Sequence, residues 1–403
     1  EHHYSHAASA FYPSPFEEAI ILTLDGVGEW ATTTVAHGKG NKIKILKEIH
    51  FPHSLGLLYS AFTYYTGFKV NGGEYKVMGL APYGKPIYKD LILENIIDLK
   101  NDGSFRLDMS YFNFATGLTM TNQKFEDLFN QPVRKSEEGL LTQFHMDIAA
   151  SIQAVTEEIV LRLTKNIFAQ YKIKNLCLAG GVALNCVANG KILKNQIFDN
   201  IWIQPAAGDA GGSLGAGLAY WHQELEKERN PKAGDSMKGS FLGPKYNNVH
   251  IEKEFKSLDA VFKNYNDKDL INTVANELNK QKTVGWFQGR MEFGPRALGG
   301  RSILGDPRSE SMQRNLNLKI KFRESFRPFA PSILFEEVKN WFEINIDSPY
   351  MLLVADIKKQ MQIPMTEKQE GLFGIDKLNI KRSKIPAITH VDYSARIQTV
   401  HPE

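Results

Sequence analysis

The chain has little cysteine, no long apolar run and almost no net charge, and each shortage excludes a class of protein. Only two of its 403 residues are cysteines, Cys177 and Cys186, too few for a disulfide framework, which favours a reducing cytoplasm. No window holds the roughly 20 apolar residues of a membrane helix, so we expect a soluble protein with no membrane partner. The opening residues show neither an initiator Met nor a signal-peptide pattern, which indicates a fragment.

The composition is that of an ordinary globular protein. Hydrophobic residues make up 42%, charged residues 23% and aromatic residues 11% of the chain, which excludes disorder, collagen and coiled coil as descriptions of the whole. At roughly 100 to 200 residues per domain, the length predicts two or three domains.

The net charge of +3 conceals one basic window at 285–327. Four acidic residues lie in it, against nine basic ones: Arg290, Arg296, Arg301, Arg308, Arg314, Lys319, Lys321, Arg323 and Arg327. Such a window, interleaved with Gly and Pro, can bind phosphates of a small ligand or of nucleic acid. The nearly neutral remainder argues against a broad nucleic-acid surface, and a solvated basic face is the alternative.

Apolar periodicity and glycine punctuation predict an α/β chain. The expected elements are a strand hairpin at 19–24 and 31–36, a helix at 55–65, a long amphipathic helix from Phe144 to Ile167, strands at 175–179 and 201–203, and helices after the glycine turns at 180–181 and 207–212. Because strand, glycine turn and helix occur twice in succession, we expect a parallel or mixed sheet with a nucleotide at the strand ends.

A polar stretch separates this region from a second domain. We expect a first domain at 1–235, a connector at 236–266 and a second domain at 267–403. The second domain should open with a helix through Leu270, Val274 and Leu278, followed by a strand at 283–287.

His2 and His6 are spaced to face one metal ion. On a helix, residues four apart share one face, and the apolar continuation at 7–11 suits a packed helix. Asp25 and Asp209, at expected strand or loop ends, are candidate carboxylate partners. Two imidazoles and a carboxylate suit Fe, Zn or Mn as a Lewis acid, whereas a frayed terminus or tag remnant is the alternative.

Two glycine turns are candidate phosphate cradles. They contain Gly180, Gly181 and Asn185 in the first case, and Gly208, Gly211 and Gly212 in the second. Bare backbone at a helix start can hold an anion closely. Neither turn matches a Walker A loop or the Rossmann fingerprint, so ordinary tight turns are an equal alternative.

Several cations are candidate phosphate ligands in or near the basic window. Lys321 and Arg323 lie at alternate positions of an expected extended segment, which would point both at one anion. A rigid Gly-Pro turn presents Arg296 and Arg301, while Lys76 is a phosphate contact or a solvated side chain. The sequence Thr389-His390-Val-Asp392 is interpreted as a polar cluster around a satisfied structural histidine.

Together the motifs at 2–11, 24–30, 73–84, 180–185 and 293–302 resemble the NodU/CmcH O-carbamoyltransferases, which include nodulation, cephamycin and tobramycin carbamoylating enzymes. The resemblance implies an actin-like ATPase-fold (ASKHA) domain followed by a YrdC-like domain. In that scheme the YrdC-like domain makes carbamoyladenylate from carbamoyl phosphate and ATP, with Mg, and the first domain transfers the carbamoyl group to a hydroxylated acceptor.

The resemblance also implies roles for particular residues. His2, His6 and Asp209 would bind the metal, most simply Fe, beside Asp25 as a catalytic carboxylate. Lys321 and Arg323 resemble the Lys-x-Arg of YrdC proteins and would be catalytic. The nucleotide and carbamoyl phosphate would contact Lys76, Gly180, Gly181, Asn185, Gly208, Gly211, Gly212, Arg290, Arg296, Arg301 and Arg327.

Family members extend beyond this sequence at both ends, so we expect the chain to lack part of each domain. A tRNA-modifying threonylcarbamoyl-type enzyme is one alternative, although its substrate suits a broader basic surface. An actin-like kinase and a non-catalytic nucleotide-binding protein are two others. The sequence does not identify the carbamoyl acceptor, and it leaves open whether the protein is a homodimer.

Overall fold

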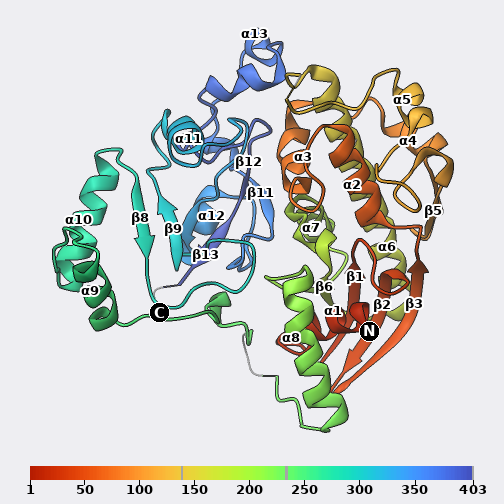
Figure 1. Cartoon of the computed structure of the whole chain (residues 1–403), viewed down its shortest axis with the longest axis horizontal. Coiled ribbons are helices and arrows are strands. Elements are labelled where there is room, and N and C mark those ends of the chain that lie inside the picture. Colours follow the sequence, from red (N-terminus) through yellow and green to blue (C-terminus); the bar gives the residue numbers. More distant parts are fainter. Residues whose placement is uncertain (138, 232–234, 402–403) are drawn as a thin grey trace.

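The structure is a computed structural model that describes residues 1–137, 139–231 and 235–401. Positions 232–234 and 402–403, within the two predicted domains, lie outside the described residues. Figure 1 shows two parts side by side, the first running from α1 to α8 and the second from α9 to β13.

The elements of the first part are α1 (His2–Phe11), β1 (Glu18–Leu24), β2 (Ala31–Lys39), β3 (Lys42–His50), α2 (Leu55–Tyr65), α3 (Glu74–Leu80), α4 (Lys89–Asn95), β4 (Ile97–Leu99), β5 (Phe105–Leu107), α5 (Gln123–Phe129), α6 (Gln143–Tyr171), β6 (Asn175–Ala179), α7 (Cys186–Lys194), β7 (Asn200–Ile203) and α8 (Asp209–Ala219). Those of the second are α9 (Asn248–Ser257), α10 (Asp267–Asn279), β8 (Val284–Phe287), β9 (Arg301–Leu304), α11 (Met312–Asn315), β10 (Ser332–Leu334), α12 (Val338–Trp341), β11 (Val354–Asp356), α13 (Glu367–Glu370), β12 (Ser394–Arg396) and β13 (Gln398–Val400).

A five-stranded mixed sheet with the order β3-β2-β1-β6-β7 organises the first part. β1, β2 and β3 are antiparallel neighbours, and Leu22 is paired with Val35. On its other side β1 runs parallel to β6, with Leu22 opposite Leu178, and β6 runs parallel to β7. The α/β class and the mixed sheet are therefore as predicted.

The core forms where β1 passes through the middle of this sheet. Every residue of β1 after Glu18 is buried, which is what a continuous apolar run produces in a strand covered on both faces. Among the largest fully buried side chains are Phe11, Ile20, Ile21, Leu22, Leu55, Leu58, Phe62 and Tyr65. None of the helices in the described ranges is long and apolar enough to cross a membrane.

Most of the predicted elements are confirmed within a few residues. The hairpin, the 55–65 helix, the long helix and both strands after it occupy the expected positions. The helix expected from about residue 183 begins later, at Cys186. A 3₁₀ turn at Gly181–Leu184 comes first, and the Asn185 side chain then accepts a hydrogen bond from the amide of Ala188, which caps the helix start.

Two expectations in the second half differ from the structure. The predicted connector contains a helix, α9, because the Asn247 side chain accepts from the His250 amide and caps it. The extended segment expected at Lys321–Arg323 is wrong. Lys321 has helical dihedrals at the end of a π-turn, and Phe322 has a φ of +46°, so the alternation rule for strands does not orient these two cations.

The two parts meet along α7 and β11 (Figure 1). The Asn189 side chain donates to the carbonyl of Leu352, and Lys194 pairs with Asp356 at 2.7 Å. A Cβ on Gly190 would lie 2.5 Å from the carbonyl oxygen of Val354. This close backbone approach brings the second part's residues next to the glycine turns of the first.

Helix α8 packs against α1 through a glycine that has no room for a side chain. A Cβ at Gly215 would lie 1.8 Å from the carbonyl oxygen of Ser5. Gly215→Ala should therefore force the two helices apart and cost about 3 kcal/mol of unfolding free energy, the upper end for overpacking.

Gly217 provides the matched control, since it lies in the same helix with nothing within 4 Å of its would-be Cβ. Gly217→Ala should stabilise the protein by up to about 1 kcal/mol through its better helix propensity. Urea unfolding of both variants measures the difference. Equal effects at the two positions would contradict the packing described for Gly215.

Candidate metal centre and basic cluster

Helix α1 places two imidazoles on one face at its start. His2 and His6 are one helical turn apart, and their Nε2 atoms lie 3.0 Å from each other. The helix start is held by Glu29, whose carboxylate accepts the backbone N–H of His2 at 2.9 Å. Gly28 has no space for a side chain there, because its Cβ would lie 2.9 Å from Cβ of His2.

Asp25 directly follows β1, and its carboxylate lies beside the imidazoles of His2 and His6. Its Oδ2 lies 2.8 Å from Nε2 of His2 and 3.4 Å from Nε2 of His6, while its Oδ1 accepts the backbone N–H of Gly181 at 2.8 Å. Burial alone would raise the pKa of Asp25. The hydrogen bonds from His6, from the Gly181 backbone and from His2 outweigh burial and hold that pKa well below its usual range, so the carboxylate is ionised at neutral pH.

Asp209 completes the cluster from the first turn of α8. Its Oδ1 lies 3.5 Å from Nε2 of His2 and 3.7 Å from Nε2 of His6. Ligand atoms of the four residues all fall within 4.8 Å of one another. His6 is fully buried, and its Nδ1 has no hydrogen-bond partner among the described residues. Two nitrogens and two carboxylates fit Fe, Zn or Mn. The structure brings together the predicted ligands His2, His6 and Asp209 and the predicted catalytic carboxylate Asp25, while metal binding itself stays a prediction.

His3, between the two, has a separate role that the sequence did not indicate. Its Nδ1 lies 2.7 Å from Oγ1 of Thr23, on β1. Burial lowers the pKa of His3 to about 4, so the ring is neutral at physiological pH. This contact ties α1 to β1 and thereby fixes the two flanking imidazoles.

The two glycine motifs lie beside this cluster, but the second is not the turn predicted at 207–212, because α8 already begins at Asp209 and contains Gly211 and Gly212. The glycines also differ in surroundings. Gly180 has a φ of +87°, and its Cβ would lie 2.2 Å from the Leu24 carbonyl oxygen. A Cβ at Gly211 would likewise lie 2.2 Å from the carbonyl oxygen of Ala206. Gly208 instead faces open space, and Gly212 meets only the His6 ring at 3.9 Å. Packing thus requires glycine at 180 and 211, whereas 208 and 212 border free volume.

The amide of Gly181 and the side chain of Asn185 are already occupied by protein groups. Gly181 donates to Asp25, and Asn185 exchanges two hydrogen bonds with Gln153, at 3.0 and 3.2 Å. The Tyr59 hydroxyl donates to the same Gln153. Gln153 was not singled out from the sequence, since a polar residue within a long amphipathic helix gives no separate signal. A nucleotide contact for Gly181 and Asn185 stays a prediction.

In the second part, a cluster of cations gathers around Arg323. We use "basic cluster" for Lys321, Arg323, Arg327 and Arg396. Burial, then the neighbouring Arg327 and Arg396, lowers the pKa of Arg323 to about 10. Burial and the charges of Arg323 and Arg327 also lower the pKa of Lys321. Repulsion among fixed cations of this kind is relieved when an anion binds.

Neighbouring contacts orient the members of the basic cluster. The Arg323 guanidinium donates through Nε to Asn317 at 2.6 Å and lies 4.7 Å from the Phe329 ring. The Arg327 guanidinium lies over the ring of Tyr75, at 4.4 Å. Because Tyr75 belongs to α3 of the first part, the basic cluster opens toward the junction of the two parts.

The remaining predicted cations are held by protein groups. Lys76 crosses the junction to Glu324 at 2.6 Å, and the half-buried Arg296 donates to the Leu184 carbonyl. Arg290 donates to the Gly243 carbonyl, while Arg301 donates to its own loop and stacks on Phe287 at 3.4 Å. Their predicted phosphate contacts are untested.

Sequence reasoning missed Arg396. Burial and the Arg396 charge lower the pKa of Arg296 to about 10, and Arg396 acts on Arg323 as well. Arg396 therefore interacts electrostatically with both predicted groups of cations, through Arg296 in one and Arg323 in the other. The sequence signal that could have found it is the position of Arg396 in the short strand β12, just after the polar cluster at 389–392.

Glu292 shapes the loop that carries Arg296. Its Oε1 accepts the backbone N–H groups of Leu298, Gly300 and Arg301, at 2.7, 2.8 and 3.3 Å. Burial would raise the pKa of Glu292, yet these hydrogen bonds outweigh it and lower the pKa. The carboxylate thus stabilises the fold while it is ionised.

Glu292→Gln should cost about 1–2 kcal/mol at pH 7, because amide–carboxylate hydrogen bonds are stronger than neutral ones. A depressed folded pKa contributes stability above the ordinary value of 4.5, and that contribution is lost as pH falls through the folded pKa. The difference in unfolding free energy between Glu292→Gln and the parent, measured by urea unfolding, should therefore be smaller at pH 3 than at pH 7. A constant gap, or a similar loss in the exposed Glu336→Gln control, would contradict this role.

The geometry defines an α/β protein with a cluster of two histidines and two aspartates that could hold a metal ion in one part and a basic cluster in the other. Two family models match it: the carbamoyltransferase N-terminus over residues 1–218, and the carbamoyltransferase C-terminus over residues 275–403. The chain belongs to the carbamoyltransferase family.

Several curated proteins are similar along nearly the whole chain. An uncharacterized protein of Synechocystis sp. is 65% identical over 405 residues, nodulation protein NolNO of Sinorhizobium fredii is 36% identical over 403, and nodulation protein NolO of Bradyrhizobium diazoefficiens is 36% identical over 405. These matches cover 99–100% of this chain but only 66%, 54% and 67% of the relatives. The chain thus spans about half to two thirds of their length.

One solved structure shows a distant likeness. The crystal structure of T. kodakarensis HypF matches 55% of this chain and 36% of its own, with a TM-score of 0.25 and 14% sequence identity. A likeness of this strength carries no argument about the fold or the site.

Proposed function

We propose that the protein of which this chain is part is an ATP-dependent O-carbamoyltransferase with two separate centres. The observation that carries the proposal is the convergence of His2, His6, Asp25 and Asp209 within 4.8 Å, in a chain of the carbamoyltransferase family. The basic cluster at the junction of the two parts supplies the second centre.

The chemistry of the second centre is an activation step. Water cleaves carbamoyl phosphate to carbamate and phosphate; a carbamate oxygen then attacks the α-phosphorus of ATP, forming carbamoyladenylate while pyrophosphate leaves. Both substrates are anions, so fixed cations must offset their repulsion and stabilise the charge that develops. Lys321 serves as a compact charge and Arg323 as a planar fork. Mg²⁺ would accompany ATP.

In the first centre, the four-residue cluster would hold the metal, most simply Fe, with Zn or Mn as alternatives. A bound metal of this kind supplies Lewis-acid polarisation. Asp25 remains ionised and is fixed by the Gly181 amide. A Cβ at Gly212 would meet only the His6 ring and one at Gly208 would meet nothing within 4 Å, so the carbamoyladenylate phosphate would bind there, next to the start of α8. The acceptor is a hydroxylated small molecule.

The sheet supports the actin-like assignment of the first part. Three antiparallel strands followed by two parallel ones, in the order β3-β2-β1-β6-β7, are the arrangement of an actin-like ATPase domain. The second part, with three two-stranded sheets among its described residues, is proposed to be YrdC-like on the family resemblance.

Exchange of labelled pyrophosphate into ATP tests the activation step. Exchange that requires carbamoyl phosphate, together with carbamoylation of a hydroxylated acceptor, is the expected result. ATP turnover without carbamoyl phosphate would favour a kinase, and transfer to tRNA a threonylcarbamoyl-type enzyme. Nucleotide binding without exchange, in the full-length protein, would leave a non-catalytic binding protein.

A further inference from the structure

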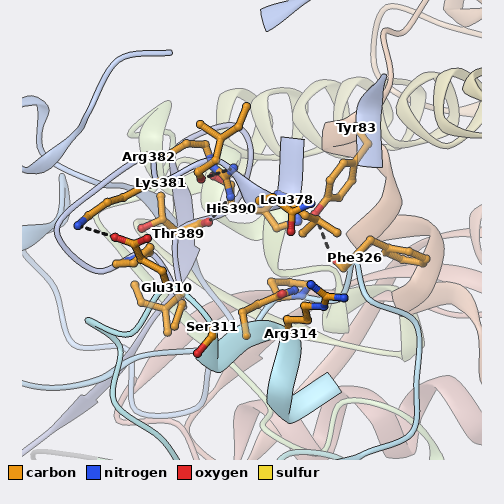
Figure 2. Close-up of a pocket in the computed structure, with 17 residues that line it drawn as sticks. Tyr83, Glu310, Ser311, Arg314, Phe326, Leu378, Lys381, Arg382, Thr389 and His390 are labelled. Carbon is orange, nitrogen blue, oxygen red and sulfur yellow. Dashed lines mark hydrogen bonds and ion pairs between the residues drawn. The ribbon is translucent and has the colours of Figure 1, made fainter. Parts of the chain in front are cut away.

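A cavity of about 220 Å³ is lined by the residues on either side of Arg327 in the sequence, but not by Arg327 itself. Its walls include Tyr83 of the first part, residues 310, 311, 313 and 314 around α11, and residues 378–382 and 386–390 (Figure 2). Phe326 and Pro328 also line it, whereas Arg327, between them, packs on Tyr75 instead. The cavity therefore has different walls from the basic cluster.

His390 lines this cavity, and within the described ranges only its Nδ1 has a charged partner, the Asp392 carboxylate. It is only 7% exposed, and neither Nδ1 nor Nε2 has a hydrogen-bond partner among the described residues. The nearest charged group is the Asp392 carboxylate, 3.6 Å from Nδ1, and the ring meets Tyr83 edge-on at 5.3 Å between centroids. The interpretation as a structural histidine with a partner therefore holds for Nδ1, which faces Asp392 and lowers the pKa of that carboxyl, whereas Nε2 has no partner among the described residues. A buried polar group without a partner is costly, which indicates a ligand.

Most other polar groups of the lining are already engaged. The buried Arg382 donates to the backbone carbonyls of residues 377, 380, 389 and 390. Lys381 pairs with Glu310 at 2.9 Å, and the Tyr83 hydroxyl donates to the Phe326 carbonyl. Figure 2 shows the Lys381–Glu310 pair at one side of the cavity.

Arg314 differs from these cations. Within residues 1–137, 139–231 and 235–401 its guanidinium forms no hydrogen bond and no ion pair, although it lines the cavity. Figure 2 places Arg314 near Phe326 and Tyr83. The lining thus offers one unpaired cation and one imidazole nitrogen without a partner, Nε2 of His390, with apolar walls from Leu378, Pro386 and Ile388.

We propose that this cavity binds a small organic anion, a phosphate monoester or a carboxylate, with its charged group on Arg314 and His390 and its apolar portion against those walls. A guanidinium recognises either anion through paired donors. The volume exceeds the roughly 30 Å³ of one water several-fold, but is below the usual range for drug-sized ligands. The site is separate from the proposed reaction.

Phenyl phosphate is the probe, measured by calorimetric titration of the protein. Binding should saturate, with inorganic phosphate about tenfold weaker because it leaves the apolar walls uncovered. Benzoate in a parallel titration distinguishes a carboxylate ligand from a phosphate one. Arg314→Gln and His390→Phe should each weaken phenyl phosphate about tenfold or more. His390→Phe keeps the ring contact with Tyr83. The exposed Lys359, outside the cavity, gives Lys359→Met as a control with parental affinity.

Two further measurements keep the result interpretable. The imidazole ¹⁵N shifts of His390, assigned by their loss in His390→Phe, should move on addition of phenyl phosphate to the parent protein. Lys321→Ala should bind the probe like the parent. The proposal is overturned by absence of saturation up to about 10 mM probe, by parental affinity in both cavity variants, by equal affinity for inorganic phosphate, or by loss of binding in Lys321→Ala.

Discussion

A His2→Ala/His6→Ala double variant should lose the metal, from about one equivalent in the parent to less than about a tenth. Two of four donors are removed, and structural and catalytic sites of this type need at least three protein ligands. Metal content of the purified protein, by elemental analysis, is the measurement. Carbamoyl transfer should fall with it, while carbamoyl phosphate-dependent pyrophosphate exchange should persist.

His37→Ala is the matched control for the metal experiment. His37 lies on β2, and its Nε2 is 2.8 Å from the Glu18 carboxylate, so it is a histidine paired with a carboxylate outside the four-residue cluster. It should retain the parental stoichiometry. Asp25→Asn, which preserves shape and still accepts the Gly181 N–H, should weaken binding through loss of charge. Unchanged metal content in the double variant would refute the assignment of the centre.

Lys321→Ala and Arg323→Ala should each slow carbamoyladenylate formation by about 10² to 10³, the usual loss when an electrostatic contact to a developing charge is removed. Transfer from separately supplied carbamoyladenylate should stay near the parental rate, because the metal centre is intact. Arg323→Lys should also be impaired. A lysine at position 323 loses the hydrogen bond from Nε to Asn317 and the guanidinium contact with the Phe329 ring, because an ammonium reproduces neither.

The exposed Lys319, two residues before Lys321, provides a control of equal charge. Lys319→Ala should leave both steps near the parental rate, since a solvated surface cation contributes little to a site. Equal loss of formation and transfer in the Lys321 and Arg323 variants would instead show that the basic window is structural, and would contradict the division into two centres.

The metal-ligand cluster is the part of the site that the sequence predicted best. His2 and His6 share a helix face because the helical repeat is local, so their spacing alone brought them together. Asp25 and Asp209 end a strand and begin a helix, where parallel topology delivers side chains to one edge of a sheet. Their approach within 4.8 Å, however, depends on α1 packing against α8 across Gly215.

The basic residues were predicted less well, because their arrangement depends on non-local contacts. Lys321 and Arg323 were expected to point together from an extended segment, but a π-turn and the positive φ of Phe322 orient them instead. Arg296 donates to a carbonyl in the first part, and Arg396 joins the cluster from a distant strand. No pattern within a short window encodes these contacts.

The sequence by itself determined the α/β class, the strand hairpin, the long helix and the glycine turns, because each follows from local periodicity and backbone freedom. It also determined the family through its motifs. Only the tertiary structure decided that the Gly181 amide donates to Asp25, that Arg396 joins the cations, and that His390 lines a cavity with its Nε2 unpartnered among the described residues. These outcomes depend on which distant segments pack together, since burial and partner choice are properties of the folded chain and not of any single stretch of it.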